Sequence, residues 1–326
     1  MSRRLALGVL SLFVLCGAPA RVEAEDEVGA ATKALADELV QDAWLHVARQ
    51  SEPARQKALA GDEAFRQGDV ALAEQRYAEA IALAPDVPTL YHRHGTALMV
   101  LQRTDEALAA FDRALAGPDP GYSWIYEAHA NRGNMLLQLG RTEEALAAYV
   151  TSLSLKPSVG AHLGRGLLYA RQGNFAKAAP DYRAAARLAP ESEQLELYAA
   201  TAEELVVSEA FVDQEAKKPG AVRTASGLVF TDVTPGSGAQ PQPTDQVRVR
   251  FRGTLRDGSL AHEVDEPMAF PLDQVIPCWT EGIARMRVGG KARLVCPAAI
   301  AYGERGGPRI PPGAALAYDI ELVSIE

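Results

Sequence analysis

Residues 270–294 read FPLDQVIPCWTEGIARMRVGGKARL, and this stretch carries the pattern that decides the C-terminal fold. Trp279, Ile283 and Met286 fall at positions i, i+4 and i+7, which is the spacing of one apolar helical face. Residues 291–296 directly after it read as a strand. The stretch therefore predicts a short helix that lies with one face on a sheet.

One more strand is predicted on each side of this stretch. In residues 247–252, VRVRFR, apolar and charged side chains alternate, which is typical of a half-buried strand. The last strand is expected to bury one apolar face, made of Leu316, Tyr318, Ile320 and Leu322. Before it, residues 302–315 form a loop rich in glycine and proline that begins with Tyr302. Three prolines fix φ in this loop, so we expect it to be stiff.

The middle of the chain contains four similar segments. The spacing between them is close to 34 residues. In each segment a glycine precedes an apolar stretch, an alanine follows it twelve residues later, and an aromatic residue comes four residues after that. These positions are Gly61, Gly95, Gly133 and Gly166; Ala73, Ala107, Ala145 and Ala178; and Tyr77, Phe111, Tyr149 and Tyr182. The pattern resembles tetratricopeptide repeats over residues 54–192, which implies stacked pairs of antiparallel helices, an α-solenoid.

The flanks of the repeats have their own patterns. Residues 27–50 read as a further amphipathic helical segment. Residues 193–218 continue the helical pattern without the repeat signature, and their polar character suits a helix that caps the solenoid. We expect residues 219–223 to be a linker, because Pro219 and Gly220 stop the helix there.

The first 24 residues have the order of segments that is typical of a secretory signal peptide. A cationic start, MSRR, precedes the apolar run LALGVLSLFVLC and the small residues of GAPARVEA. Cleavage is expected after Ala20 or Ala24, with an uncleaved anchor as the alternative. The apolar run is shorter than the ~20 residues of a membrane span, so we expect an exported protein, periplasmic or extracellular.

Residues 224–326 resemble an FKBP-type peptidyl-prolyl cis-trans isomerase. The resemblance rests on the motifs TASGLVF, GSGAQPQPTDQVRVRFRGTLRDG, FPLDQVIPCWTEGIARMRVGGKARL, AYGERG and IPPGAALAYDIEL, which occur in family order. The motifs TASGL and VIPxWTE are most similar to those of exported bacterial members of this family. The resemblance implies an α+β domain, an antiparallel sheet wrapped on a short helix, so the whole chain is expected to be multidomain.

The resemblance also implies a shallow apolar site that needs no cofactor or metal. Trp279 is its floor, and the Tyr302 hydroxyl and the backbone N–H of Ile276 hold substrate carbonyls. The implied substrate-binding walls are Phe251, Phe270, Val275, Ile310 and Tyr318. Twisting an X-Pro bond breaks the amide resonance behind a barrier of ~18–20 kcal/mol. A dry apolar pocket favours the less polar twisted state, which is differential binding of the transition state.

The stretch DGSLAHEVDEP departs from the family pattern. Ala261 and His262 stand where the family has an aromatic residue and an acid, and the loop is about three residues shorter. Glu263 or Asp265 is the possible substitute for the acid. We therefore expect reduced activity, and we expect His262 to be an exposed loop residue rather than a metal ligand.

The net charge bears on the possible partners, and the cysteine content bears on possible disulfides. A net charge of −9 and a pI near 5.3 argue against nucleic acid as a partner. After loss of the signal, Cys278 and Cys296 are the remaining cysteines. Two buried free thiols are the default expectation, and a disulfide between them is the alternative, because their separation in space decides the pairing.

Three functions are open at this stage. The leading hypothesis is an exported isomerase that assists folding, whose repeats recruit clients or an envelope partner on their concave face. The second is a holdase with a weak or inactive isomerase domain, and the third is a structural adaptor. A clamp for carboxylate peptides, known in some repeat proteins, is not expected, because its positions carry Ala58, Asp62, Arg93, Glu127 and Asn131.

Overall fold

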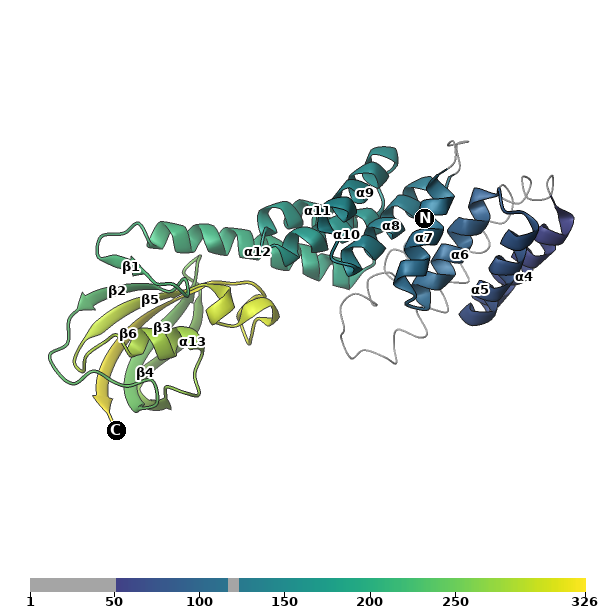
Figure 1. Ribbon diagram of the computed structural model, residues 1–326. Helices are drawn as coiled ribbons and strands as arrows, with labels where there is room; N and C mark the ends of the chain where they lie inside the picture. The colour runs from purple at the N-terminus through teal and green to yellow at the C-terminus, as the bar shows by residue number, and fades with distance from the viewer. Residues whose placement is uncertain (1–50, 117–122) are drawn as a thin grey trace. The chain divides into compact units, whose positions relative to one another are not determined.

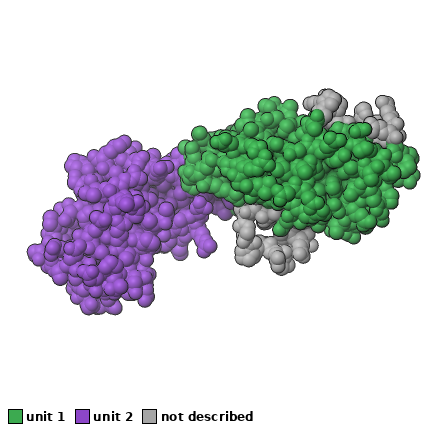
Figure 2. Space-filling model, in the orientation of Figure 1, with its two compact units in different colours: residues 1–196 green, residues 197–326 purple. Residues whose placement is uncertain are grey.

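The computed structural model describes residues 51–116 and 123–326 of the 326-residue chain (Figure 1). The expected signal peptide and the helical segment expected at 27–50 lie outside the described residues. The chain divides into two compact units, Met1–Glu196 and Leu197–Glu326, which Figure 2 colours separately. No helix among the described residues has the length and apolar character needed to cross a bilayer.

The described residues of unit 1 contain four helix pairs, as the repeats predict. They are α4 (Glu52–Arg66) with α5 (Val70–Leu83), α6 (Pro88–Val100) with α7 (Thr104–Leu115), α8 (Ile125–Gln138) with α9 (Thr142–Leu155), and α10 (Val159–Arg171) with α11 (Phe175–Leu188). Ser51, Asp69, Ser158 and Asn174 cap helix N-termini by accepting from backbone N–H groups. The predicted all-α solenoid is confirmed.

The repeat glycines make room for the repeat aromatics. A Cβ added at Gly133 would lie 2.7 Å from the Tyr149 ring, and one at Gly61 would lie 2.7 Å from the Tyr77 ring. The Tyr149 ring also lies against Gly164 of the following pair. Each ring thus fills a space that only glycine leaves open. The constant spacing between glycine and aromatic residue in the sequence therefore reflects a packing contact in each repeat.

Two of the repeat tyrosines form hydrogen bonds inside the repeats. The Tyr77 hydroxyl donates to Asp62 Oδ1 at 2.7 Å, and the Tyr149 hydroxyl donates to Asn134 Oδ1 at 2.8 Å. Ala58 and Asp62 are both buried. Two of the positions that a carboxylate clamp would use are therefore part of the core.

Unit 2 contains most of one long helix and an antiparallel sheet. Its elements are α12 (Glu193–Glu215), β1 (Ala221–Arg223), β2 (Val229–Thr234), β3 (Gln246–Leu255), β4 (Leu260–Pro271), α13 (Pro277–Ile283), β5 (Lys291–Cys296), η2 (Ala298–Ile300), η3 (Gly303–Arg305) and β6 (Leu316–Ile325). The strand order is β1-β2-β5-β6-β3-β4. The predicted α+β class is confirmed, and α13 lies across the sheet in Figure 1.

The two central strands are buried on both faces. Leu294 and Tyr318 point to the core that contains Trp279 of α13, whereas Val295 and Ala317 pack with Val212 of α12. Side chains of a strand alternate between the faces, so α12 and α13 cover opposite faces of the sheet. This explains why the end of β5, residues 294–296, and the start of β6, residues 316–318, read as short continuous apolar runs.

Three segments differ from the sequence expectations. Residues Ala221–Arg223, expected in a linker, pair with β2 as an edge strand; three residues are too few for a visible alternation. The segment expected to cap the repeats forms α12, and its residues from Leu197 onward belong to unit 2. The stretch with Ala261 and His262 is not a loop but the start of β4, paired with β3.

Candidate functional site

An apolar pocket of about 350 Å³ opens on the α13 face of the sheet. Strands, a loop and a helix converge on it, and its lining residues are Phe251, His262, Phe270, Gln274, Val275, Ile276, Trp279, Tyr302 and Tyr318. Seven of the eight residues that the resemblance assigns to the site line this cavity. The exception is Ile310, which is 3% exposed and belongs to the core beside the pocket.

Trp279 is held in place by aromatic rings on three sides. Its ring meets Phe251 at 4.6 Å, Tyr318 at 5.3 Å and Phe270 at 5.6 Å between centroids, each nearly perpendicular. Edge-to-face contacts of this kind are favourable and specify ring orientation. The indole Nε1–H is buried and has no hydrogen-bond partner among the described residues. The floor of the pocket is therefore rigid and almost free of polar partners.

Ile276 sits at the entrance to α13. It adopts extended backbone angles, φ −61° and ψ 145°, and Pro277 begins the helix after it. Its carbonyl accepts from the N–H groups of Trp279 and Thr280, while its own N–H has no acceptor within residues 51–116 and 123–326. A free backbone donor at the wall of an apolar pocket is available to a substrate carbonyl.

Tyr302 closes the pocket from the loop before β6. Its ring lies over Gly307, where an added Cβ would stand 3.1 Å from the ring, and Gly306 turns the chain with φ +65°. Tyr318 lies below it. Burial, followed by the charge and hydrogen bond of Tyr302, raises the pKa of Tyr318, so the Tyr318 hydroxyl stays neutral at physiological pH.

His262 is in the site, contrary to the expectation of an exposed loop residue. It lies on β4 opposite Gly253, is half-buried, and its ring centroid is 5.9 Å from that of Tyr302. Burial first, and then the nearby Arg309 charge, lowers the pKa of His262. The imidazole is therefore neutral at pH 7. Ala261, the residue before His262, is 4% exposed and packs in the core that contains Trp279.

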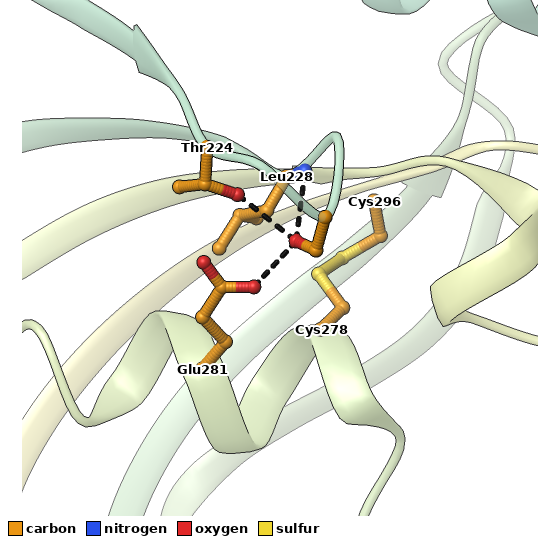
Figure 3. Close-up of a disulfide and its surroundings, with 6 residues drawn as sticks. Thr224, Leu228, Cys278, Glu281 and Cys296 are labelled. Atoms are coloured by element: carbon orange, nitrogen blue, oxygen red, sulfur yellow. Dashed lines mark hydrogen bonds between the residues drawn. A yellow bond between two sulfur atoms is a disulfide. The ribbon is translucent and has the colours of Figure 1, made fainter.

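Two bonds anchor α13 under the pocket (Figure 3). Cys278 forms a disulfide with Cys296 at the end of β5, with Cα atoms 5.8 Å apart. The default expectation of free thiols is therefore wrong. Residues 18 apart in sequence meet because the chain folds back between α13 and β5, which the sequence alone does not reveal.

The second anchor joins α13 to the turn before β2. The Ser226 hydroxyl donates to Glu281, and the Thr224 and Ser226 hydroxyls lie 2.9 Å apart (Figure 3). Burial alone would raise the pKa of Glu281, but hydrogen bonds from Ser226, Thr224 and Arg285 outweigh it and lower the pKa. Trp279 thus lies between two fixed residues of its helix, Cys278 and Glu281.

The described residues contain no group of three histidine, cysteine or acidic side chains that converges as a metal site would. The arrangement is an apolar cavity with a rigid floor, a free backbone N–H and a tyrosine hydroxyl. It can bind a small apolar ring and hold carbonyl oxygens beside it. It offers no nucleophile and no activated base at its centre.

Comparison with protein families matches both parts of the chain. The model of the FKBP-type peptidyl-prolyl cis-trans isomerase matches residues 237–323. The tetratricopeptide-repeat model matches residues 59–123 and 130–193.

Curated relatives share the C-terminal part. A protein from Aeromonas hydrophila named FKBP-type peptidyl-prolyl cis-trans isomerase FkpA is 46% identical over 121 residues, which is 36% of this chain and 45% of the relative. FkpA of Escherichia coli K12 is 42% identical over 114 residues, 34% of this chain and 42% of the relative. An FKBP-type 22 kDa isomerase of the same organism is 43% identical over 119 residues, 35% of this chain and 58% of the relative. The chain therefore spans about half the length of these relatives.

Solved structures give similar matches. A crystal structure of a peptidyl-prolyl cis-trans isomerase from Pseudomonas syringae is 37% identical, with a TM-score of 0.38, and the match covers 39% of this chain and 96% of that one. The crystal structure of FkpA from Escherichia coli is 30% identical, with a TM-score of 0.40, and the match covers 63% of this chain and 98% of that one.

Proposed function

This chain joins tetratricopeptide repeats to a domain of the FKBP-type peptidyl-prolyl isomerase family, and on that premise we propose that it catalyses cis–trans isomerisation of X-Pro bonds in client polypeptides. The observation that carries the proposal is the apolar pocket floored by Trp279 and closed by Tyr302. The relatives whose names state this activity support it as well.

The proposed mechanism uses shape and polarity rather than proton transfer. The prolyl ring would lie on Trp279 between Phe251, Phe270 and Val275, in contact with apolar surface only. The Ile276 N–H and the Tyr302 hydroxyl would hold substrate carbonyls on either side of the ring. With both sides held, rotation about the X-Pro bond proceeds in a dry pocket that favours the less polar twisted amide.

The histidine at position 262 leads us to expect a lower isomerisation rate than that of a site with an acid there. The family pattern implies an acid here that orders the tyrosine hydroxyl, and a neutral imidazole near Tyr302 is a weaker acceptor than a carboxylate. If one to two such contacts of ~1–1.5 kcal/mol are lost, the rate falls ~10- to 100-fold below that of a full site. We therefore propose an active but slow isomerase.

The rest of the chain fits a folding assistant outside the cytoplasm. We propose that the N-terminal stretch directs export, and that the repeats recruit proline-containing clients or a protein partner of the envelope. Uncatalysed X-Pro isomerisation takes tens to hundreds of seconds, so even a slow enzyme tethered to its client would matter. A buried disulfide suits an oxidising compartment.

The second candidate function, a holdase, makes a different prediction for one experiment. The full chain would be added to a protein whose refolding is limited by X-Pro isomerisation. An isomerase at substoichiometric concentration raises the rate constant of the slow phase, and Trp279→Leu abolishes that effect. A holdase needs stoichiometric amounts, suppresses aggregation, and leaves the rate constant unchanged; that result would reject the isomerase proposal.

A further inference from the structure

Helix α12 contacts the loop that carries Tyr302, and it does so through a glycine that the packing requires. Gly313 has φ +82°, and a Cβ there would lie 2.9 Å from Leu205 Cγ and 2.9 Å from the Thr201 carbonyl oxygen. Gly313 is buried, and Leu205 is half-buried against it. The end of the loop therefore rests directly on the helix surface.

Ser208, one turn further along α12, adds a polar contact to the same loop. Its hydroxyl oxygen accepts the Ala315 backbone N–H at 2.8 Å in a buried position, and the serine is 3% exposed. The hydroxyl in turn donates to Glu204 at 3.2 Å, which pairs with Arg256. A buried backbone donor without this acceptor would be costly, so Ser208 specifies the position of residue 315.

The contact reaches Tyr302 through the loop's own backbone. The Gly313 N–H donates to the Gly303 carbonyl at 2.9 Å, next in sequence to Tyr302. Within the same loop Gly307 and Ile310 exchange two backbone hydrogen bonds of 2.9 Å, and the Tyr302 ring lies over Gly307. The loop is thus a closed unit, and fixing residues 313–315 fixes the tyrosine.

We propose that the 201–208 segment of α12 is a positioning element for Tyr302, so that the working isomerase unit begins near Leu197 rather than at the family domain. The family match begins at residue 237, and α12 lies before it in the chain, whereas the compact unit begins at Leu197. Thr201, Leu205 and Ser208 act through the loop and do not touch the pocket. The inference rests on the proposed isomerase function only in its kinetic test.

The kinetic test is a double-mutant cycle in the full chain. Leu205→Ala and Ser208→Ala should each lower kcat/KM about 3- to 10-fold, chiefly in kcat if the lost contact acts in the transition state. In a Tyr302→Phe background the same substitutions should have almost no further effect, because the group they position is gone. Ser208→Thr keeps the hydroxyl and should restore most of the activity.

Val212→Ala is the matched control. Val212 lies on the same helix and packs with Val229 and Val295; Ala315 belongs to the same cluster, but Val212 takes no part in the Gly313 contact or in the Ser208 hydrogen bond. It should lower stability, and any effect on kcat/KM should be the same with Tyr302 or Phe at position 302. Equal effects of Leu205→Ala in both backgrounds would overturn the positioning role.

A second measurement does not depend on catalysis. Amide hydrogen exchange at Gly313 and Ala315 should be slow in the native chain and much faster in Ser208→Ala, with little change in β3. Unchanged exchange would overturn the inference even if the chain is an active isomerase. Conversely, a chain without isomerase activity that still shows this exchange pattern would reject the proposed function while leaving the structural coupling intact.

Discussion

His262 is the residue on which the rate of the proposed reaction depends most. Its ring lies 5.9 Å from the Tyr302 ring in the pocket wall. His262→Asp would place a carboxylate where it can accept from the tyrosine hydroxyl, and an ionised acceptor forms the stronger hydrogen bond. We expect kcat/KM for a proline peptide to rise up to about 10-fold.

Glu263→Gln is the control for this change, because Glu263 is the next residue on β4 and pairs with Arg252 outside the pocket. It should leave kcat/KM unchanged. A drop in kcat/KM for His262→Asp would show that the imidazole itself contributes to binding.

His92 makes the repeats sensitive to acid. It is 5% exposed and stacks on Trp124 at 4.7 Å, and neither ring nitrogen has a hydrogen-bond partner among the described residues. Burial, and then the charge of Arg93, lowers the pKa of His92 to about 3. In the unfolded chain a histidine titrates near ~6.5. Between these values the unfolded state binds a proton that the folded state refuses, so stability is lost as pH falls.

Urea unfolding of the repeats at pH 7 and pH 4.5 measures this effect. The native chain should lose on the order of 2 kcal/mol at pH 4.5 through His92. His92→Phe, which keeps a ring on Trp124, should remove most of that loss. If the two proteins lose stability equally with pH, His92 is not the group responsible.

At the scale of elements, α13 is held by a covalent and a polar anchor. Replacing both cysteines by alanine removes a cross-link between residues 18 apart, which should cost ~2–4 kcal/mol in unit 2. Hydrogen exchange of α13 in increasing urea measures the loss. Both sulfurs are fully buried, so mild reductant should not reproduce it in the native chain. An unchanged exchange midpoint in the double variant would show that the disulfide adds no stability.

The sequence predicted the elements whose patterns are local. Trp279 and Ile283 fall on one face of α13 and Met286 is buried just beyond it, and Leu316 to Leu322 alternate along β6 as expected. What it missed depends on contacts between distant segments. A prediction of the disulfide would have required the distance between α13 and β5. A prediction that His262 lies in the pocket would have required the register of β4 on β3.

The unit to which α12 belongs also depends on contacts between distant segments. Near the C-terminal end of α12, Val212 packs on the C-terminal sheet with Val229 and Val295. A helix that follows a repeat array and precedes a sheet has an amphipathic pattern that suits either neighbour. Ile310 is apolar like the pocket residues and belongs to the same core as Trp279, but it is not among the residues that line the pocket.

At the scale of the whole molecule, the proposed export makes a prediction about the mature chain. The small residues around Ala20 and Ala24 predict cleavage at one of these positions. Protein recovered from the cells that make it should begin at Arg21 or Glu25, as N-terminal sequencing would detect. An intact Met1 in a cytoplasmic fraction would contradict export.

The central claim is that the pocket around Trp279 and Tyr302 catalyses X-Pro isomerisation. The most direct measurement is NMR exchange between the cis and trans forms of a proline peptide in the presence of catalytic amounts of the full chain, with a panel of residues before proline. The account predicts exchange well above the uncatalysed rate for at least one apolar residue before proline. It also predicts near-background exchange for Trp279→Leu, with the far-UV spectrum unchanged. A folded native chain with background exchange for every peptide would contradict the account.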